Sequence, residues 1–260
     1  MTSVRAPFES EPLPEGLSAI TSIDQMDEET KRTVFAQIAE LSHTENDHGF
    51  MFSVSPETAE RSLTDPLCGG MILISEVDGH VVVAGYAKIM PLSHHATLDL
   101  PPVYEFGGLV VNPEFRGHKL SEYLIRRLTT EFIEKREEIA QEAPLIIATT
   151  KNAAAKRAFE RTWEYVGKFR GFPAMMALTC TCNPPFGNGM HVANLDNGGL
   201  CQFRTDDDAM HKPDSIPCHL CINNRELAES YNRAIMEQYA AHAHPVAHLV
   251  NDLKTAEHYD

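Results

Sequence analysis

The 260-residue sequence has few basic residues: 22 Lys and Arg stand against 37 Asp and Glu, which gives a formal net charge of −15. A nucleic-acid-binding protein needs a basic surface to displace counterions from phosphates, so this charge balance argues against that class. It favours a cationic small molecule or a basic peptide over an anionic partner. Nucleic acid is therefore not an expected partner.

Long apolar runs are also missing. The longest ones, such as residues 71–74 and 144–148, are far too short to span a bilayer. The first sixteen residues, MTSVRAPFESEPLPEG, are acidic and proline-rich and lack the apolar stretch of a secretory signal. We therefore expect a cytoplasmic protein with no membrane partner. In that compartment the six cysteines are expected to be thiols or metal ligands rather than disulfides.

The pattern of apolar residues and turn signals predicts a mixed α/β fold. We expect a flexible leader at 1–16, a main domain at 17–179 and a C-terminal extension at 180–260. Strands are predicted at 17–23, 71–77, 80–90, 104–111, 143–149 and 169–178, and helices from 24 or 27 to 41 and at 55–65, 119–139, 152–165 and 224–242. The extension has too few large apolar residues for a core of its own. We expect it to dock on the main domain, to be held by a metal or to stay partly mobile.

The segment from Glu105 to Ser121, EFGGLVVNPEFRGHKLS, joins a buried strand to an amphipathic helix through a tight loop. The first N–H groups of that helix, with the helix dipole behind them, form a site suited to a pyrophosphate. Gly117 lets the backbone approach the anion, and Arg116 and Lys119 add positive charge. The segment is therefore the predicted anion-binding site.

This segment resembles the acyl-CoA signature of the GNAT superfamily of N-acetyltransferases, which is a strand E-x-x-x-L-x-V-x-P, a loop R/Q-x-x-G-x-G/A and a helix. Four residues match the strand: Glu105, Leu109, Val111 and Pro113. Arg116 matches the start of the loop. Lys119 stands where the family usually has Gly, and Ser121 where it has Gly or Ala. We expect a helical backbone at Lys119 to accommodate its side chain.

A second match lies downstream, where the family commonly carries N-x-x-A-x-x-x-Y-E. Asn152, Ala155 and Glu160 match this pattern, but Phe159 stands at the Tyr position. The resemblance covers about residues 17–178. It implies the GNAT fold, a mixed and mostly antiparallel central sheet flanked by helices, to which this chain adds a Cys-rich C-terminal extension.

The resemblance implies an acyltransferase that moves an acetyl or short acyl group from acyl-CoA, with acetyl-CoA as the expected co-substrate, to a primary amine of a small molecule or peptide. Glu105 is the implied catalytic base for direct attack in a ternary complex. The implied cofactor-binding residues are Leu109, Val110, Val111, Arg116, Gly117, His118, Lys119, Leu120, Ser121 and Asn152. The alternative for Glu105 is a solvated carboxylate at a strand end, and the alternative for Asn152 is a helix N-cap.

Phe159 has no proton to give to the departing thiolate. The thiolate then leaves unassisted or takes a proton from Tyr104, Tyr165, water or the extension. Phe159 and Trp163 are themselves expected in the core. The same substitution favours an alternative function, a non-catalytic acyl-CoA-binding GNAT module with a zinc-stapled interaction tail. A homodimer and the identity of the amine stay open.

The cysteines after residue 179 form two close pairs. The C-x-x-C spacing lets a tight turn aim two sulfurs at one tetrahedral ion, and a second pair would complete the site. The predicted ligands of a structural Zn²⁺ are Cys180, Cys182, Cys218 and Cys221, with Cys201, His191, His211 and His219 as replacements. The alternatives are ordinary strand cysteines and a redox C-x-x-C.

Overall fold

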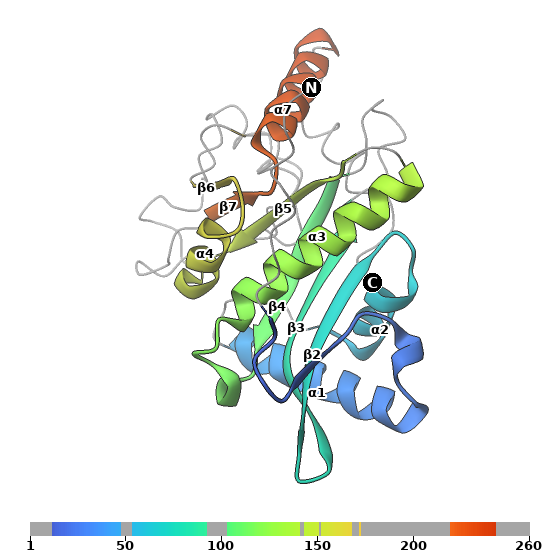
Figure 1. Cartoon of the computed structure of the whole chain (residues 1–260). Coiled ribbons are helices and arrows are strands. Elements are labelled where there is room, and N and C mark those ends of the chain that lie inside the picture. The colour runs from blue at the N-terminus through green and yellow to red at the C-terminus, as the bar shows by residue number, and fades with distance from the viewer. Residues whose placement is uncertain are drawn as a thin grey trace. The chain divides into compact units, whose positions relative to one another are not determined.

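The structure, a computed structural model, describes residues 12–47, 54–92, 103–140, 143–150, 152–167, 172 and 219–242 (Figure 1). The chain divides into two compact units. Unit 1 draws its described residues from 1–90, 106–143 and 157–162, and unit 2 from 91–105, 144–156 and 163–260. Strands β3 (His80–Pro91) and β4 (Val103–Val111) and helix α4 (Ala153–Glu160) contribute residues to both units.

The elements follow the predicted alternation of strands and helices. In chain order they are β1 (Leu17–Ile20), η1 (Ile23–Gln25), α1 (Glu28–Asp47), α2 (Pro56–Thr64), β2 (Gly69–Val77), β3 (His80–Pro91), β4 (Val103–Val111), η2 (Pro113–Phe115), α3 (Leu120–Ala140), β5 (Leu145–Thr150), α4 (Ala153–Glu160), β6 (Tyr165–Gly167), β7 (His219–Ile222) and α7 (Arg225–His242). None of the helices in these described ranges is both long and apolar enough to cross a membrane.

The described strands form one sheet in the order β1-β2-β3-β4-β5-β7-β6. Strands β4 and β5 run parallel, whereas the pairs β1–β2, β2–β3, β5–β7 and β6–β7 are antiparallel. The predicted α/β class, with a mostly antiparallel sheet flanked by helices, is confirmed. Among the cysteines of the predicted extension, Cys221 alone lies in the described residues, so the structure does not address a Cys-rich extension.

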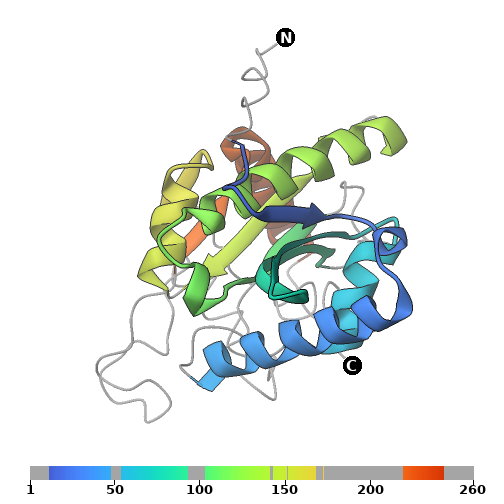
Figure 2. The same cartoon turned by 60° about the horizontal axis from the view of Figure 1, so that its bottom comes forward.

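In unit 1, helices cover both faces of the strands. Figure 2 shows α1 and α2 on one face and α3 on the other. Between the strands and α1–α2 lies a buried cluster that includes Val34, Ile38, Ile72, Val83, Tyr86 and Val110. On the α3 face the packing is tight at Gly85, where an added Cβ would lie 3.1 Å from Leu124 Cδ1. The two faces of β4 therefore meet different helices.

In unit 2, β7 lies between β5 and the edge strand β6, and it pairs with β5 from Ile147↔Ile222 to Thr150↔His219. Asn223 fastens this pair, because its Oδ1 accepts a hydrogen bond from Ile146 N at 2.8 Å and its Nδ2 donates to Pro144 O at 3.3 Å. Residues 219–222 thus complete the sheet, although they lie far along the chain from β6.

Four element predictions need correction or stay untested. Helix α1 continues to Asp47 instead of ending at residue 41. The expected first strand stops at Ile20, because Ser22 caps a 3-10 turn at Ile23–Gln25. Helix α4 ends at Glu160 instead of 165, since residues 165–167 enter the sheet as β6. The predicted strand at 169–178 falls almost entirely outside the described residues. Strand β7 was not predicted, because HLCI is too short a run to stand out.

Candidate active site

The C-terminal half of β4 is irregular. Gly108 has φ +63°, a left-handed conformation that interrupts the pleat of the strand, and an added Cβ there would lie 3.2 Å from Tyr86 Cε1. After this position Val110 packs in the cluster under α1. Val111 instead lies near Gly85, on the α3 side. The interruption changes the direction of the backbone at Leu109–Val111, the segment predicted to bind the pantetheine.

The chain leaves β4 through a fixed turn at Asn112. Its N donates to Ala84 O at 3.0 Å and its Nδ2 to Val83 O at 3.0 Å, while its Oδ1 accepts from Glu114 N at 3.1 Å. The side chain thereby ties β3 to η2 and caps η2 at the same time. This arrangement sets the point from which the predicted anion loop starts.

The loop from Arg116 to Lys119 turns sharply into α3. Gly117 has φ +94° and Lys119 has φ +56°, and both residues are exposed. Lys119 O accepts from Tyr123 N at 3.1 Å, so Lys119 stands immediately before the first turn of the helix. The expected helical backbone at Lys119 is wrong. The left-handed φ explains why the family prefers Gly at this position, since a Cβ is strained there.

The charges around the start of α3 favour an anion. Arg116 and Lys119 are exposed, and Arg116 Nε donates to Val111 O at 3.4 Å. Glu122, the acidic residue in the first helical turn, forms an ion pair with Arg161, which offsets its charge. The amides of Leu120 and Ser121 begin the helix, where the dipole adds partial positive charge. The positive charges and the helix start thus lie where the sequence predicts an anion to bind.

Unit 2 contains the two remaining predicted residues. Glu105 is half-buried and pairs with Ile147 in the last of the three parallel pairs between β4 and β5. Asn152 follows β5, and its Oδ1 accepts from Ala154 N at 2.8 Å and Ala155 N at 3.2 Å. The N-cap alternative for Asn152 is therefore correct, although it leaves the side-chain Nδ2 available to donate.

The aromatic residues considered for proton transfer separate into buried and accessible ones. Phe159 is 3% exposed and packs edge-on against Phe106 with 5.5 Å between ring centroids, which confirms its core position. Tyr104 is 1% exposed. Tyr165 is partly exposed, the Arg225 guanidinium lies 5.9 Å from its ring centroid, and partial burial raises the pKa of its hydroxyl.

The predicted zinc ligands are largely outside the described residues, which include only Cys221. That residue is a buried thiol in β7, and the tight turn expected over 218–221 is replaced from residue 219 by an extended strand. Within the described ranges, no group of three or more His, Cys, Asp or Glu side chains could hold a metal ion. The zinc site stays a prediction.

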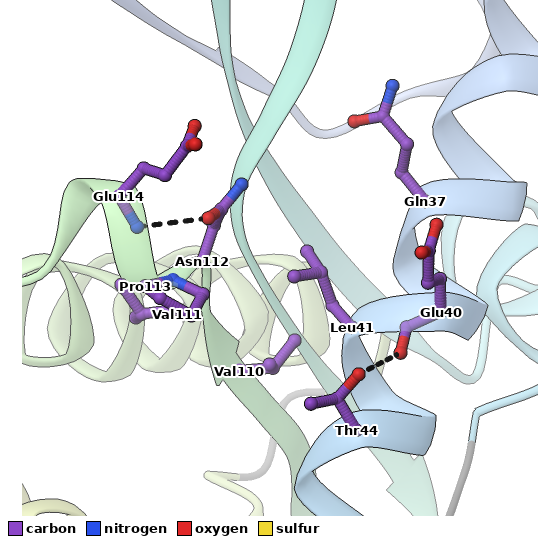
Figure 3. A pocket seen from close by; sticks show the side chains of 9 residues that line it. All are labelled: Gln37, Glu40, Leu41, Thr44, Val110, Val111, Asn112, Pro113 and Glu114. Carbon is purple, nitrogen blue, oxygen red and sulfur yellow. Dashed lines mark hydrogen bonds between the residues drawn. The ribbon is translucent and has the colours of Figure 1, made fainter.

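A pocket that the sequence did not reveal lies on the α1 side of the end of β4. It has a volume of about 420 Å³. Its lining residues are Gln37, Glu40, Leu41, Thr44, Val110, Val111, Asn112, Pro113 and Glu114 (Figure 3). The four lining residues from α1 are spaced three or four positions apart. In a sequence this spacing indicates only one face of a helix, so it does not distinguish a pocket from a solvent-exposed surface.

Comparisons with solved structures give distant likenesses. Glucosamine-6-phosphate N-acetyltransferase from Arabidopsis thaliana is 14% identical, with 56% of this chain and 90% of that chain covered and a TM-score of 0.37. N-myristoyltransferase from Saccharomyces cerevisiae, with bound myristoyl-CoA, is 15% identical over 55% of this chain and 31% of that chain, with a TM-score of 0.39. A GNAT acetyltransferase from Streptococcus agalactiae is 12% identical over 57% of this chain and 85% of that chain, with a TM-score of 0.33.

No curated protein matches the sequence. The model of the acetyltransferase (GNAT) family matches residues 35–165, which is half of the chain. The match includes β4, the anion-binding turn, β5 and Asn152. The chain therefore belongs to the GNAT family of acetyltransferases.

Proposed function

We propose that the protein transfers an acetyl or short acyl group from acyl-CoA to a primary amine of a small molecule or peptide. The observation that carries the proposal is the turn from Arg116 to Lys119, where two left-handed residues lead from β4 into the start of α3. Such a turn presents amides and positive charge to a pyrophosphate. Acyl-CoA contains a pyrophosphate, and acyl-CoA is the donor that the GNAT family uses.

In this proposal the backbone of Leu109–Val111 pairs with the pantetheine and polarises the thioester carbonyl. Residues 116–121 (Arg116, Gly117, His118, Lys119, Leu120 and Ser121) hold the pyrophosphate. The Nδ2 of Asn152 donates to the pantetheine while its Oδ1 caps α4. The donor is thus bound mainly through backbone groups, whose positions the fold fixes.

The reaction follows from these positions. Glu105 accepts a proton from the acceptor ammonium, directly or through a water molecule. The neutral nitrogen attacks the carbonyl carbon, the C–N bond forms, the C–S bond breaks, and the nitrogen releases its second proton to water. The thiolate takes up a proton and leaves as CoA. Of the two tyrosines considered as its source, Tyr165 is partly exposed and Tyr104 is buried, so we assign this step to Tyr165 or water.

The test combines calorimetry with transfer from radiolabelled acetyl-CoA to a panel of amines. The wild-type protein is expected to bind acetyl-CoA and to turn over. Arg116→Ala is expected to weaken acetyl-CoA binding by roughly tenfold, because a charge-assisted contact to phosphate is lost. Arg32→Ala, an exposed change on α1, serves as the control. Absence of acetyl-CoA binding by the wild-type protein contradicts the proposal.

One observation favours a second function, a non-catalytic acyl-CoA-binding module. Phe159 packs in the core in place of the family's tyrosine. Binding of acetyl-CoA without turnover of any amine would support this module. Its proposed zinc-stapled tail is tested by metal analysis of protein purified without added zinc, where less than about half an equivalent speaks against a structural site.

A further inference from the structure

A buried hydrogen-bonded pair joins α2 to β3. Tyr86 on β3 is fully buried, and its hydroxyl lies 3.0 Å from the Oγ of Ser62, which is 2% exposed on α2. Ser62 Oγ also donates to Ala59 O at 2.7 Å. A serine hydroxyl has one proton, so the Tyr86 hydroxyl is the donor in the bond between the two side chains. Burial raises the pKa of Tyr86, so this proton is retained.

The ring of Tyr86 contacts β4 where that strand is interrupted, at Gly108. An added Cβ at Gly108 would lie 3.2 Å from Tyr86 Cε1 and 3.2 Å from Lys88 Cγ. Cε1 is bonded to the ring carbon that carries the hydroxyl. The end of the ring that Ser62 holds is therefore the end that lies against Gly108, and the hydrogen bond fixes the surface on which the Gly108 backbone packs.

Ser62 is itself held in place from two sides. An added Cβ at Gly70 would lie 2.4 Å from Ser62 Oγ, so the hydroxyl lies directly against the main chain of β2. Its own proton is bound to Ala59 O inside α2. A continuous set of contacts thus leads from α2 through Ser62 and Tyr86 to the backbone of β4, entirely within unit 1.

The position of Gly108 determines the direction of the backbone that follows it. Its left-handed φ of +63° turns the chain just before Leu109–Val111, the segment proposed to bind and polarise the thioester. A main-chain donor polarises a carbonyl strongly only within a narrow range of distance and angle. A small displacement of Gly108 would therefore weaken the polarisation without removing the donor.

We propose that Tyr86 is a positioning residue for acyl transfer, which together with Ser62 holds the interruption at Gly108 so that the backbone of Leu109–Val111 polarises the thioester carbonyl, an inference that rests on the proposed function. Tyr86 acts through the backbone of β4. Because its hydroxyl is fully buried and donates to Ser62, it takes no part in transferring a proton to the thiolate.

The test measures the infrared carbonyl band of acetyl-CoA, isotopically labelled at the thioester carbonyl and bound without any amine. In the wild-type protein, hydrogen bonding is expected to move the band of the bound molecule to lower wavenumber than that of the free molecule. Tyr86→Phe and Ser62→Ala break the same bond. Each is expected to lose roughly half of this shift or more, while the Kd for acetyl-CoA changes by less than about twofold. The double variant is expected to lose no more than either single variant.

Ser42→Ala is the matched control. Ser42 is fully buried on α1, donates to Ala39 O at 2.9 Å and accepts from Val54 N at 2.8 Å. This change therefore removes a buried helix hydroxyl with two hydrogen bonds, as Ser62→Ala does, but its partners are not on β3. It is expected to leave the carbonyl band of bound acetyl-CoA unchanged.

Three results would overturn the proposal for Tyr86. They are a wild-type band that does not shift on binding, a full shift retained by Tyr86→Phe or Ser62→Ala, and an equal loss of the shift in Ser42→Ala. Either of the first two variants is sufficient, since both break the same bond. Calorimetry with acetyl-CoA separates these results from a failure of the proposed function, which is seen as absence of binding by the wild-type protein.

Discussion

Gln37 on α1 and Asn112 at the end of β4 form hydrogen bonds with the main-chain N–H and C=O of the same residue, Val83. Gln37 Oε1 accepts from Val83 N at 2.7 Å, and Asn112 Nδ2 donates to Val83 O at 3.0 Å. Val83 is fully buried, so an unsatisfied amide or carbonyl there would be costly. These two side chains replace strand pairing where β4 ends, and they hold α1 and η2 on either side of the pocket beside β4.

Asn112→Asp tests this relationship. The carboxylate still accepts from Glu114 N, but it can no longer donate to Val83 O, against which it places a negative charge. The free energy of unfolding is expected to fall by about 2 kcal/mol. Urea titration measures the loss. Asn224→Asp is the control, because Asn224 caps α7 through its Oδ1 alone, and its effect is expected to stay within about 0.5 kcal/mol.

The left-handed backbone at Lys119 predicts a difference between two substitutions. Lys119→Gly removes the Cβ, whereas Lys119→Ala keeps it, and both remove the charge. The Gly variant is expected to be more stable than the Ala variant by about 1 kcal/mol, since a Cβ is strained at positive φ. Denaturant midpoints of the two variants provide the measurement. Equal stabilities would show that the φ of this residue is not left-handed in solution.

Glu105→Gln removes the proposed base and preserves the size of the side chain. The kcat for acetyl transfer is expected to fall by roughly 10²-fold or more, while the KM for acetyl-CoA stays unchanged. The comparison is made between pH 6 and 9, with Glu76→Gln as a control for the lost charge. A variant with the full rate across that range would remove Glu105 from the mechanism.

Phe159→Tyr restores the hydroxyl that the family usually has. Because the ring packs in the core against Phe106, the added hydroxyl is expected to cost about 1–2 kcal/mol of stability. The kcat is expected to change by less than about twofold. Denaturation and steady-state kinetics on the same preparation give both values. A tenfold or greater rise in kcat would instead mean that the ring reaches the departing thiolate.

Cys68 predicts a loss of stability in alkaline solution. It is 1% exposed, and burial raises the pKa of its thiol from 9.0 to about 11. The folded state therefore holds the proton more tightly than the unfolded state. This contribution is complete below pH 9 and is lost as the pH rises toward about 11. Denaturant midpoints at pH 8 and 10.5 are expected to differ less in Cys68→Ala than in the wild-type protein.

The sequence alone predicted the order of most strands and helices, because apolar spacing in long elements such as α3 reports burial directly. It also located the turn between β4 and α3, since a strand, Arg116, Gly117 and a helix start follow one another without a gap. The sequence also indicated Asn152 as a helix N-cap, because an Asn side chain forms this hydrogen bond with residues only two or three positions further along the chain. These features depend on neighbours within a few residues of one another.

Tertiary structure decided the rest. Strand β7 is four residues long and pairs with β5 through contacts between residues 69 to 75 positions apart in sequence, which no local pattern encodes. The left-handed φ of Lys119 contradicts the preference of its residue type. The pocket beside β4 is lined by residues of α1 and of the segment that follows β4, which are far apart in sequence. Long-range contacts, rather than composition, bring these groups together.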